Sequence, residues 1–551
     1  MAPTTTNNTH DQLEVHNEAT GMDPYLVAQA KAAHERDMEL GFRKALKNFG
    51  PGIFFSMMLS VALIMEGFDV AINGSYWGQS WFLKRFGTLQ PDGKYVVSAS
   101  WQAACGNASG VGSLIGLMAN GYSQYHWGSK PTYLVAMVGM AAAIFLPVFA
   151  TNVKVLFAGN FACGLFWGVF QTLTTAYASE IAPTALRAHM TSFVNICWAC
   201  GLFIGSGVVR GTLHIDSYMS YRLPFMLQWI WPVPLFVCAC FAPESPWFLV
   251  RKGKEEKARR AIRRTARKGY FSEADLDAEV ALIRHTLEIE KNETKQQGLL
   301  NCFRGSNLRR TEITCLTYAI QTWCGQPMTG LATQILTRAG MNEDNAFNIN
   351  MGMFGMLFIG TVLVWGGMGK WGRRRIYLIG QVAVALCLLG MGILGSVKQT
   401  PNVLYGIGAF MMLLNLVFAC SLGPLCYAIV GELPGAEVRG PTIALARATY
   451  GISGVITGQL NPRMITEWGW NVKVAYFYLG TCIIGLVYTY FRLPETQHRS
   501  FGELDVLFNN RVPARKFRTT KVDQFYEHGG SNTPTDEKDF DKEAVSHVER
   551  V

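Results

Sequence analysis

Charged residues are scarce in this chain of 551 residues. Asp, Glu, Lys and Arg make up 16% of it, against about 25% in soluble domains, and the mean hydropathy is +0.16. Half of the residues are apolar, which excludes a disordered or fibrous chain. The composition argues against a soluble globular enzyme and favours a protein whose main solvent is lipid.

Several chemical patterns are also missing. The 13 cysteines stand mostly singly inside apolar runs, without the paired spacing of a metal site, so we interpret them as small buried hydrophobes. The sequence has no Ser-His-Asp, zinc or phosphate-loop pattern, and we expect no enzyme activity, no metal and no cofactor. The net charge of +10 arises from residues between hydrophobic blocks. A nucleic-acid partner is therefore not expected, since a binder concentrates its basic residues on one domain.

Apolar stretches of about twenty residues recur from Pro51 onward, each long enough to cross a bilayer core of about 30 Å. They predict an all-α membrane protein, monomeric in the lipid bilayer, with twelve transmembrane helices. The spans near 190 and 441 are the weakest by hydropathy, because Gly and polar side chains interrupt them. The predicted spans are 51–71, 98–119, 131–150, 154–178, 190–210, 222–242, 312–336, 347–369, 375–395, 403–430, 441–463 and 472–492.

The spans form two sets of six, separated by a polar loop of about seventy residues. No secretory signal peptide precedes them, and basic residues gather in the central loop and at Arg373 to Arg375. Because basic loops stay inside, we expect both termini to be cytoplasmic. The predicted units are an N-terminal tail at 1–50, a six-helix bundle at 51–242, the central loop at 243–311, a second six-helix bundle at 312–492 and a C-terminal tail at 493–551.

Three motifs occur once in each half of the membrane region. The copies are 252, 251 and 244 residues apart, which indicates a duplication. Six spans separate them, so the halves have the same orientation, as in the two parallel repeats of the major facilitator fold. Glu180-Ile-Ala-Pro-Thr-Ala-Leu-Arg187 matches Glu432-Leu-Pro-Gly-Ala-Glu-Val-Arg439, Pro243-Glu244-Ser245 matches Pro494-Glu495-Thr496, and Gly128-Ser129-Lys130 matches Gly372-Arg373-Arg374.

Ionisable side chains inside the spans are costly, at about 2.5–3.5 kcal/mol each on insertion scales. Glu66 and Asp69 stand three residues apart, on one face of the first span, and two carboxylates in a poorly solvated cavity are suited to carry protons. The alternative is that both lie at the helix end in a wet vestibule. Arg447 in span eleven can balance one of the charges. We predict that Asp69, Glu66 and Arg447 couple transport to a proton.

Two further groups of residues are candidates for gating and for binding. Charge pairs at helix ends suit the rocking of two domains, although they are also ordinary topology charges. Amide and aromatic side chains inside spans suit a sugar, whose hydroxyls bind amides and whose C–H faces stack on rings, although each alone is more often helix packing. The candidate gates are Glu180, Arg187, Arg373, Arg374, Glu432 and Arg439, and the candidate substrate ligands are Asn160, Gln171, Asn195, Trp198, Gln321, Thr322, Tyr427 and Tyr450.

Specific strings of residues extend over 50–510, almost the whole membrane portion. They resemble the sugar porter family of the major facilitator superfamily, and within it the fungal α-glucoside:proton symporters of the maltose permease type. The strings are Glu66-Gly67-Phe68-Asp69, Trp167-Gly168-Val169-Phe170-Gln171-Thr172-Leu173-Thr174, Tyr177-Ala178-Ser179-Glu180, Val194-Asn195-Ile196-Cys197-Trp198, Pro243-Glu244-Ser245-Pro246-Trp247-Phe248-Leu249-Val250, Gly423-Pro424-Leu425-Cys426-Tyr427, Ala446-Arg447, Pro494-Glu495-Thr496 and Glu503-Leu504-Asp505-Val506-Leu507-Phe508.

The resemblance implies proton-coupled uptake of a di- or trisaccharide at the plasma membrane. It implies coupling by the carboxylates of the first span and sugar contacts at Asn195, Gln321, Thr322, Tyr427 and Tyr450. Asn160 stands where monosaccharide symporters have Arg, which argues against a simple hexose carrier. Other departures from the family pattern are Tyr125 and His126 in place of an Asp-Arg pair, Ser113 in place of an acidic residue, Leu202 and Thr322 in place of Gln, and Pro327 in place of Asn.

The substrate class we expect is maltose, trehalose, sucrose, raffinose or a relative of these. One alternative is a non-transporting sugar sensor, although the tail after Arg492 is short and of mixed charge. Another is a permease that has drifted to a different glycoside or a secondary metabolite. A glycosylation sequon, Asn73-Gly74-Ser75, is predicted to lie just outside the first span.

Overall fold

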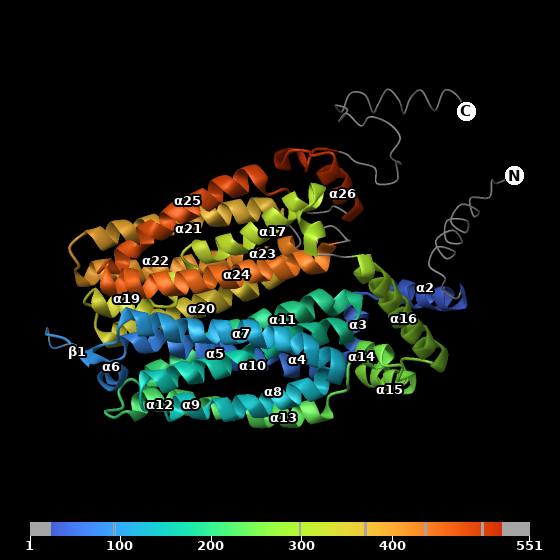
Figure 1. The fold of residues 1–551 in the computed structure, drawn as a ribbon, viewed down its shortest axis with the longest axis horizontal. Coiled ribbons are helices and arrows are strands. Elements are labelled where there is room, and N and C mark those ends of the chain that lie inside the picture. The colour runs from blue at the N-terminus through green and yellow to red at the C-terminus, as the bar shows by residue number, and fades with distance from the viewer. Residues whose placement is uncertain are drawn as a thin grey trace.

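The computed structural model describes residues 24–91, 93, 95–296, 299–367, 372–434, 438–496 and 501–520. Long helices run side by side along the longest axis of the molecule (Figure 1). At one end, called the tail end, lie α2 (Pro24–Glu39), α16 (Glu273–Gln296) and α26 (Phe501–Asn509). At the other, called the opposite end, lie α6 (Ser80–Phe86), α12 (Met219–Leu227) and α19 (Ala332–Arg338).

The first half of the membrane region, the N half, consists of six long or interrupted helical spans. Two short strands, β1 (Thr88–Leu89) and β2 (Tyr95–Val96), pair antiparallel at the opposite end. Besides α6 and α12, its helices are α3 (Phe42–Asn48), α4 (Gly50–Ser60), α5 (Ala62–Ser75), η1 (Tyr76–Gly78), α7 (Ala99–Trp127), α8 (Ser129–Ala143), α9 (Phe145–Val148), α10 (Val153–Ile181), α11 (Thr184–Thr212), η2 (Gln228–Ile230) and α13 (Pro232–Phe241).

The second half, the C half, follows a helical segment at the tail end. That segment contains α14 (Pro246–Arg251), α15 (Glu255–Thr265), α16 and η3 (Leu299–Phe303). Besides α19 and α26, the helices of the C half are α17 (Gly305–Trp323), α18 (Gln326–Thr329), α20 (Glu343–Gly367), α21 (Arg373–Ser396), α22 (Pro401–Cys420), α23 (Leu422–Glu432), α24 (Arg439–Pro462), η5 (Arg463–Glu467), η6 (Asn471–Lys473), α25 (Val474–Arg492) and η7 (Ala514–Lys516).

Nine helical segments among the described residues are long and apolar enough to cross a membrane. The other three predicted spans coincide with α7, α24 and the interrupted run α17–α18–α19, which small and polar side chains make less apolar. Of the two spans predicted to be the weakest by hydropathy, the one near 441 is among these three, and the one near 190 passes at Phe193–Thr212 with a hydropathy of 1.5, which equals the lowest value among the nine. The twelve-helix fold expected from the sequence is confirmed.

Two spans of the C half are broken near their middle, and both breaks have a local cause. Gly325 has a φ of +87°, a conformation that glycine adopts without steric cost, and Pro327 then starts the new helix α18. Between α22 and α23 the chain leaves helical geometry at Ser421, and Pro424 follows in the first turn of α23, where proline is tolerated. Broken membrane helices expose backbone polar groups, which transporters use at substrate sites.

Each half has its own hydrophobic core, and a few residues of each half pack into the core of the other half. Ala71 and Leu202 of the N half belong to the core of the C half, while Phe347 of the C half belongs to the core of the N half. Trp198 and Leu331 pack against both cores. The halves are therefore in close contact where α5 and α11 meet α19 and α20.

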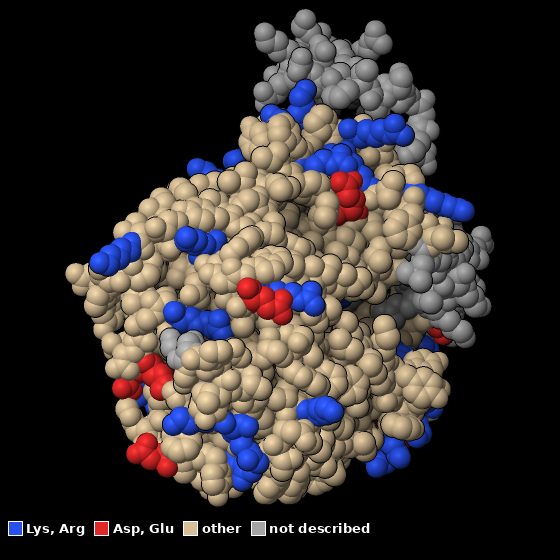
Figure 2. Space-filling view, turned by 60° about the vertical axis from the view of Figure 1, so that its left-hand side comes forward, with Lys and Arg blue, Asp and Glu red and all other residues tan. Residues whose placement is uncertain are grey.

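The outward faces of the helices are apolar. Val135, Leu363, Leu386 and Ile484 are each more than 60% exposed, which is unfavourable in water over so large a surface. In Figure 2, uncharged surface predominates and the Lys, Arg, Asp and Glu side chains are scattered rather than gathered in one patch. These faces suit contact with lipid, and the chain is a multi-pass membrane protein.

A helical layer covers the tail end of the N half. The helices α14, α15 and α16 share a small core that includes Leu249 and Ile262. The helix α2 packs along α16, and Arg36 of α2 pairs with Asp275 and with Glu279, the latter at 2.8 Å. The central loop thus contains a 24-residue helix, α16, that holds the first described helix, α2.

Candidate functional site

Asp69 lies in α5, inside the N half, and is 3% exposed. Its carboxylate accepts hydrogen bonds from three side chains on three elements: Nε2 of Gln228 at 2.9 Å, Nδ2 of Asn73 at 3.0 Å and Nε1 of Trp167 at 3.2 Å. The donors are neutral, so they compensate the lost hydration of the carboxylate without neutralising its charge. Asp69 does not lie in a wet vestibule.

Glu66 stands one turn before Asp69 and faces the C half. It is 5% exposed, and its Oε1 accepts a hydrogen bond of 2.5 Å from Nε2 of Gln171 in α10. Its Oε2 is buried and has no hydrogen-bond partner among the described residues. The guanidinium of Arg447 is close enough to attract the Glu66 carboxylate. A buried polar atom without a partner calls for a ligand, a water or a proton.

Arg447 of α24 is enclosed by tyrosine rings of the C half. Its guanidinium carbon lies 5.3 Å from the ring centre of Tyr427 and 5.5 Å from that of Tyr318. The ring of Tyr318 also lies 5.6 Å from that of Tyr450. Aromatic faces attract a cation where water is scarce, so Arg447 keeps its charge inside the membrane region. Its positive charge also acts on the Glu66 carboxylate.

The two broken spans meet through Gln321, at the end of α17. Its Nε2 donates a hydrogen bond of 3.2 Å to the backbone carbonyl of Gly423, which follows the break between α22 and α23. Its Oε1 is buried without a hydrogen-bond partner in the described part of the chain. Gln321 therefore has one free hydrogen-bond acceptor, its Oε1, beside the two interrupted helices, and this atom can bind a ligand there.

The remaining predicted substrate ligands differ in whether their side chains can still bind a sugar. Nδ2 of Asn160 donates to the carbonyl of Cys105 at 3.3 Å, and Oγ1 of Thr322 donates to the carbonyl of Ala319 at 2.7 Å, so both are engaged with helix backbones. Tyr427 is 44% exposed. Asn195 and Trp198 of α11 are half-buried, and Trp198 touches both cores.

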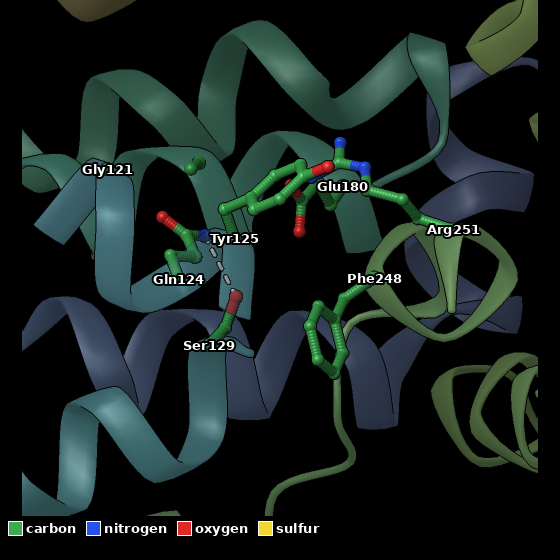
Figure 3. A pocket seen from close by; sticks show the side chains of 8 residues that line it. Gly121, Gln124, Tyr125, Ser129, Glu180, Phe248 and Arg251 are labelled. Carbon is green, nitrogen blue, oxygen red and sulfur yellow. Dashed lines mark hydrogen bonds between the residues drawn. The ribbon is translucent and has the colours of Figure 1, made fainter. Parts of the chain in front are cut away.

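The candidate gates lie at the tail end, where the two halves differ. In the C half, Nη2 of Arg373 pairs with Oε1 of Glu432 at 3.1 Å. Arg374 instead donates to the carbonyl of Tyr490 at 2.8 Å. In the N half, Glu180 lines a cavity with Tyr125 and Arg251 (Figure 3).

The other two candidate gates begin helices. Arg187 is exposed in the first turn of α11. Arg439 is the first residue of α24, and its side chain lies outside the described part of the structure.

Glu244, in the repeated Pro-Glu-Ser motif, holds the start of α8. Its Oε1 accepts the backbone N–H groups of Ser129 at 2.9 Å and Lys130 at 3.2 Å. Burial raises the pKa of the Glu244 carboxyl, while the hydrogen bonds it accepts act the other way. Its copy Glu495 lies against Gly372 at the start of α21, where an added Cβ would meet its Oε2.

At the opposite end, a group of residues that we call the seal joins the two halves. The hydroxyl of Ser75 accepts from Nδ2 of Asn350 at 3.1 Å, and Glu343 accepts from both the N–H and the hydroxyl of Ser80 at 2.6 Å. Closely packed backbone completes this contact. The seal comprises Gly74, Ser75, Gly78, Ser80 and Arg210 of the N half and Gly330, Thr333, Glu343, Asp344 and Asn350 of the C half.

Three residues of the site are absent from the sequence predictions: Gln228, Asn73 and Tyr318. Gln228 could have been found as an amide inside the apolar sixth span, because a buried amide needs a partner. Asn73 follows Asp69 at helical spacing.

The glycosylation sequon predicted at Asn73 does not lie outside the first span. The helix α5 continues to Ser75, and the Asn73 side-chain amide donates a hydrogen bond to Asp69.

Comparison with known proteins agrees with this architecture. The family model described as "Sugar (and other) transporter" matches residues 55–508. The general alpha-glucoside permease of Saccharomyces cerevisiae is 35% identical over 525 residues, covering 94% of this chain and 84% of the permease. Maltose permease MAL31 of the same yeast is 35% identical over 509 residues, covering 91% and 82%. The resemblance inferred from the motifs is confirmed, and these relatives are permeases rather than enzymes.

Solved structures support the fold at lower identity. The xylose transporter XylE from E. coli, in a partially occluded inward-open conformation, aligns with a TM-score of 0.67 and 18% identity, covering 81% of this chain and 99% of XylE. The proton:xylose symporter structure of XylE with 6-bromo-6-deoxy-D-glucose aligns with a TM-score of 0.65 and 19% identity, covering 84% and 100%. The chain belongs to the sugar (and other) transporter family of the major facilitator superfamily.

Proposed function

We propose that this sugar transporter carries an α-glucoside of the maltose, trehalose, sucrose or raffinose class into the cell together with a proton. It works at the plasma membrane by alternating access, with its tail end and both termini in the cytosol. The observation that carries the proposal is the pair of buried carboxylates in α5. Asp69 is held by three donors within the N half, while Glu66 keeps one oxygen without a partner and faces Arg447 of the C half.

The two carboxylates have different roles in this proposal. A proton on Asp69 removes the charge that orders Gln228 and Trp167, which come from the sixth and fourth spans. A proton on Glu66 removes its attraction to Arg447 and so weakens the link between the halves. Both changes occur at helices that must move when the halves rock.

The sugar site is placed between these carboxylates and the broken helices of the C half. Gln321 offers a hydrogen-bond acceptor to the sugar. Gln171 offers its side-chain amide, which is hydrogen-bonded to Glu66. Tyr427 offers an exposed ring face on which the C–H side of a pyranose can stack. Trp198 provides a second aromatic surface where both cores meet. The yeast relatives are named for α-glucosides and for maltose, and this supports a disaccharide over a hexose.

Proton entry supplies enough free energy to accumulate the sugar inside the cell. One proton entering supplies about 2.3 kcal/mol per 100 mV of membrane potential and about 1.4 kcal/mol per unit of pH difference. Together these terms support a sugar gradient of several hundredfold. Asp69 and Glu66 are the groups we assign to this step, with Arg447 as the counter-charge, and no other cofactor is part of the proposal.

Uptake of radiolabelled maltose into yeast cells that lack their own α-glucoside permeases tests the proposal. We expect uptake that is faster at about pH 5 than at about pH 7, because a proton is a co-substrate. Unlabelled trehalose, sucrose and raffinose, each in excess, then define the class by competition. An expressed chain at the cell surface that takes up none of these sugars contradicts the proposal and favours a sensor or a permease for another compound.

A further inference from the structure

Arg210 joins the two halves at the opposite end of the molecule. It lies near the end of α11 in the N half, and its Nε donates a hydrogen bond of 2.7 Å to Oδ1 of Asn348 in α20 of the C half. Its Nη1 lies 3.0 Å from Oδ1 of Asp344, in the first turn of the same helix, where a negative side chain is favourable. Arg210 therefore links α11 to α20 by one hydrogen bond and one ion pair.

His214 adds a titratable group to this contact. It lies in the turn after α11, and its side chain is 66% exposed. Its Nε2 lies 3.0 Å from Nη1 of Arg210 and 3.2 Å from Oδ1 of Asp344. In a neutral imidazole this nitrogen can accept a hydrogen bond from the arginine, whereas in an imidazolium it can only donate. A protonated His214 therefore has its partner in the C half, at Asp344.

The charged groups beside His214 divide between the two halves. Asp216 lies two residues later in the same turn, and Glu343 precedes Asp344 in α20. Arg210 and Asp216 stay with His214 when the halves separate, so their effects on an imidazolium are present in both conformations. Asp344 and Glu343 move away with the C half. The attraction between a protonated His214 and these carboxylates thus exists only while the seal is closed.

We propose that His214 is a proton sensor of the seal, and that a proton taken up from outside strengthens the closure of the seal through Asp344. A proton that binds the sealed conformation more tightly shifts the equilibrium toward it. Histidine changes its charge between about pH 5 and about pH 8, the range in which external acid drives the proposed uptake. The inference rests on the alternating access and the orientation proposed above, but not on the identity of the sugar.

The test uses the full chain in yeast cells, with a Thr333→Cys reporter in the seal and a membrane-impermeant maleimide added outside. Thr333 is buried when the seal is closed, so the labelling rate follows the fraction of open molecules. Labelling of the same chain without the reporter is subtracted. The reactivity of a thiol itself depends on pH, so the rate of each variant is divided by the rate of the parent at the same pH.

His214→Gln cannot gain a charge. We expect the ratio of its rate to the parent rate to rise up to about fivefold between about pH 7.5 and about pH 5, since an ion pair between exposed side chains supports a shift of this size. His214→Lys carries its charge at both pH values and should label more slowly than His214→Gln at both, by the same factor.

Two further variants separate the charge from a merely structural role. Asp344→Asn removes the nearest partner across the seal, and in this background His214→Gln should have little effect on the pH dependence of labelling. Asp216→Asn is the matched control, because it removes a carboxylate from the same turn but on the N half. It should keep the pH dependence of the parent. A histidine that only packs in the turn has no reason to depend on Asp344.

A ratio for His214→Gln that stays the same at both pH values, or that falls in acid, overturns the sensor. So does an undiminished effect of His214→Gln in the Asp344→Asn background. Maltose uptake is measured in the same cells without the reporter. A pH-dependent ratio in a chain that takes up no α-glucoside would contradict the proposed substrate class and leave the sensor standing. Uptake with a constant ratio would contradict the sensor alone.

Discussion

Gly74 is the position where the seal is most sensitive to one added methyl group. A Cβ at Gly74 in α5 would lie 2.5 Å from the backbone oxygen of Gly330, between α18 and α19. Gly330 belongs to the other half of the molecule and is backbone, so no flexible side chain can move aside. Gly74→Ala therefore forces the two halves apart at the opposite end while it leaves the polar contacts of Ser75 chemically intact.

The structure gives the size of the effect. Ordinary contact begins at 3.4 Å, so the seal must open locally by 0.9 Å, the difference between 3.4 and 2.5 Å, to admit the methyl group. Overpacking of this kind costs about 1–3 kcal/mol in well-packed regions. Because the cost falls only on the sealed conformation, it shifts the equilibrium toward the open one by about 5- to 150-fold.

Labelling of the Thr333→Cys reporter by an impermeant maleimide measures this shift in intact cells. Thr333 is 1% exposed when the seal is closed, so the labelling rate follows the fraction of open molecules. Gly110→Ala is the matched control, since a Cβ at Gly110 in α7 would meet nothing within 4 Å. A Gly74→Ala variant that labels at the rate of the Gly110→Ala variant would refute the close backbone contact between the halves.

Three further predictions concern single side chains. Gln228→Leu removes one of the donors to Asp69 and should lower stability by about 1–3 kcal/mol, measured by thermal unfolding in detergent, and slow proton-coupled uptake. Arg447→Met removes the positive charge that acts on Glu66 and should abolish uptake, whereas Arg447→Lys retains part of it. Burial raises the pKa of Glu244, so its contribution to stability is present below the ordinary carboxyl pKa and is lost as the pH rises through the folded-state pKa. Glu244→Gln cannot lose a proton, and its melting temperature should increasingly exceed that of the parent between about pH 4 and about pH 8.

Each of these predictions has an outcome that contradicts it. Unchanged stability and uptake in Gln228→Leu would mean that the amide does not hold Asp69. Full uptake by Arg447→Met would show that the guanidinium has no part in coupling. A constant difference in melting temperature across the pH range would show that Glu244 does not titrate with folding.

The sequence predicts the membrane region well, because hydrophobic length is a local property. The three less apolar spans, among them the interrupted span seven at 312–336, are also predicted. The break itself depends on the backbone of Gly325, whose conformation follows from packing rather than composition. The same holds for the first span, whose helix continues through Asn73 and so removes the sequon from the aqueous loop.

The candidate site is predicted in part. The cost of charge in lipid singles out Glu66, Asp69 and Arg447 from the sequence. Their partners do not follow in the same way, because Gln228 is 159 residues from Asp69 along the chain and only the packing of six helices brings them together. Conversely, Asn160 has the right chemistry for a sugar, but its amide is bonded to the backbone of α7.

The most direct test of the central claim, that the carboxylates of α5 couple sugar uptake to proton entry, is the pH of a lightly buffered suspension of cells expressing the chain. Addition of maltose should alkalinise the medium as protons enter with the sugar. The account predicts that Asp69→Asn, present at the surface in equal amount, abolishes the alkalinisation. Alkalinisation that persists unchanged in Asp69→Asn would contradict it.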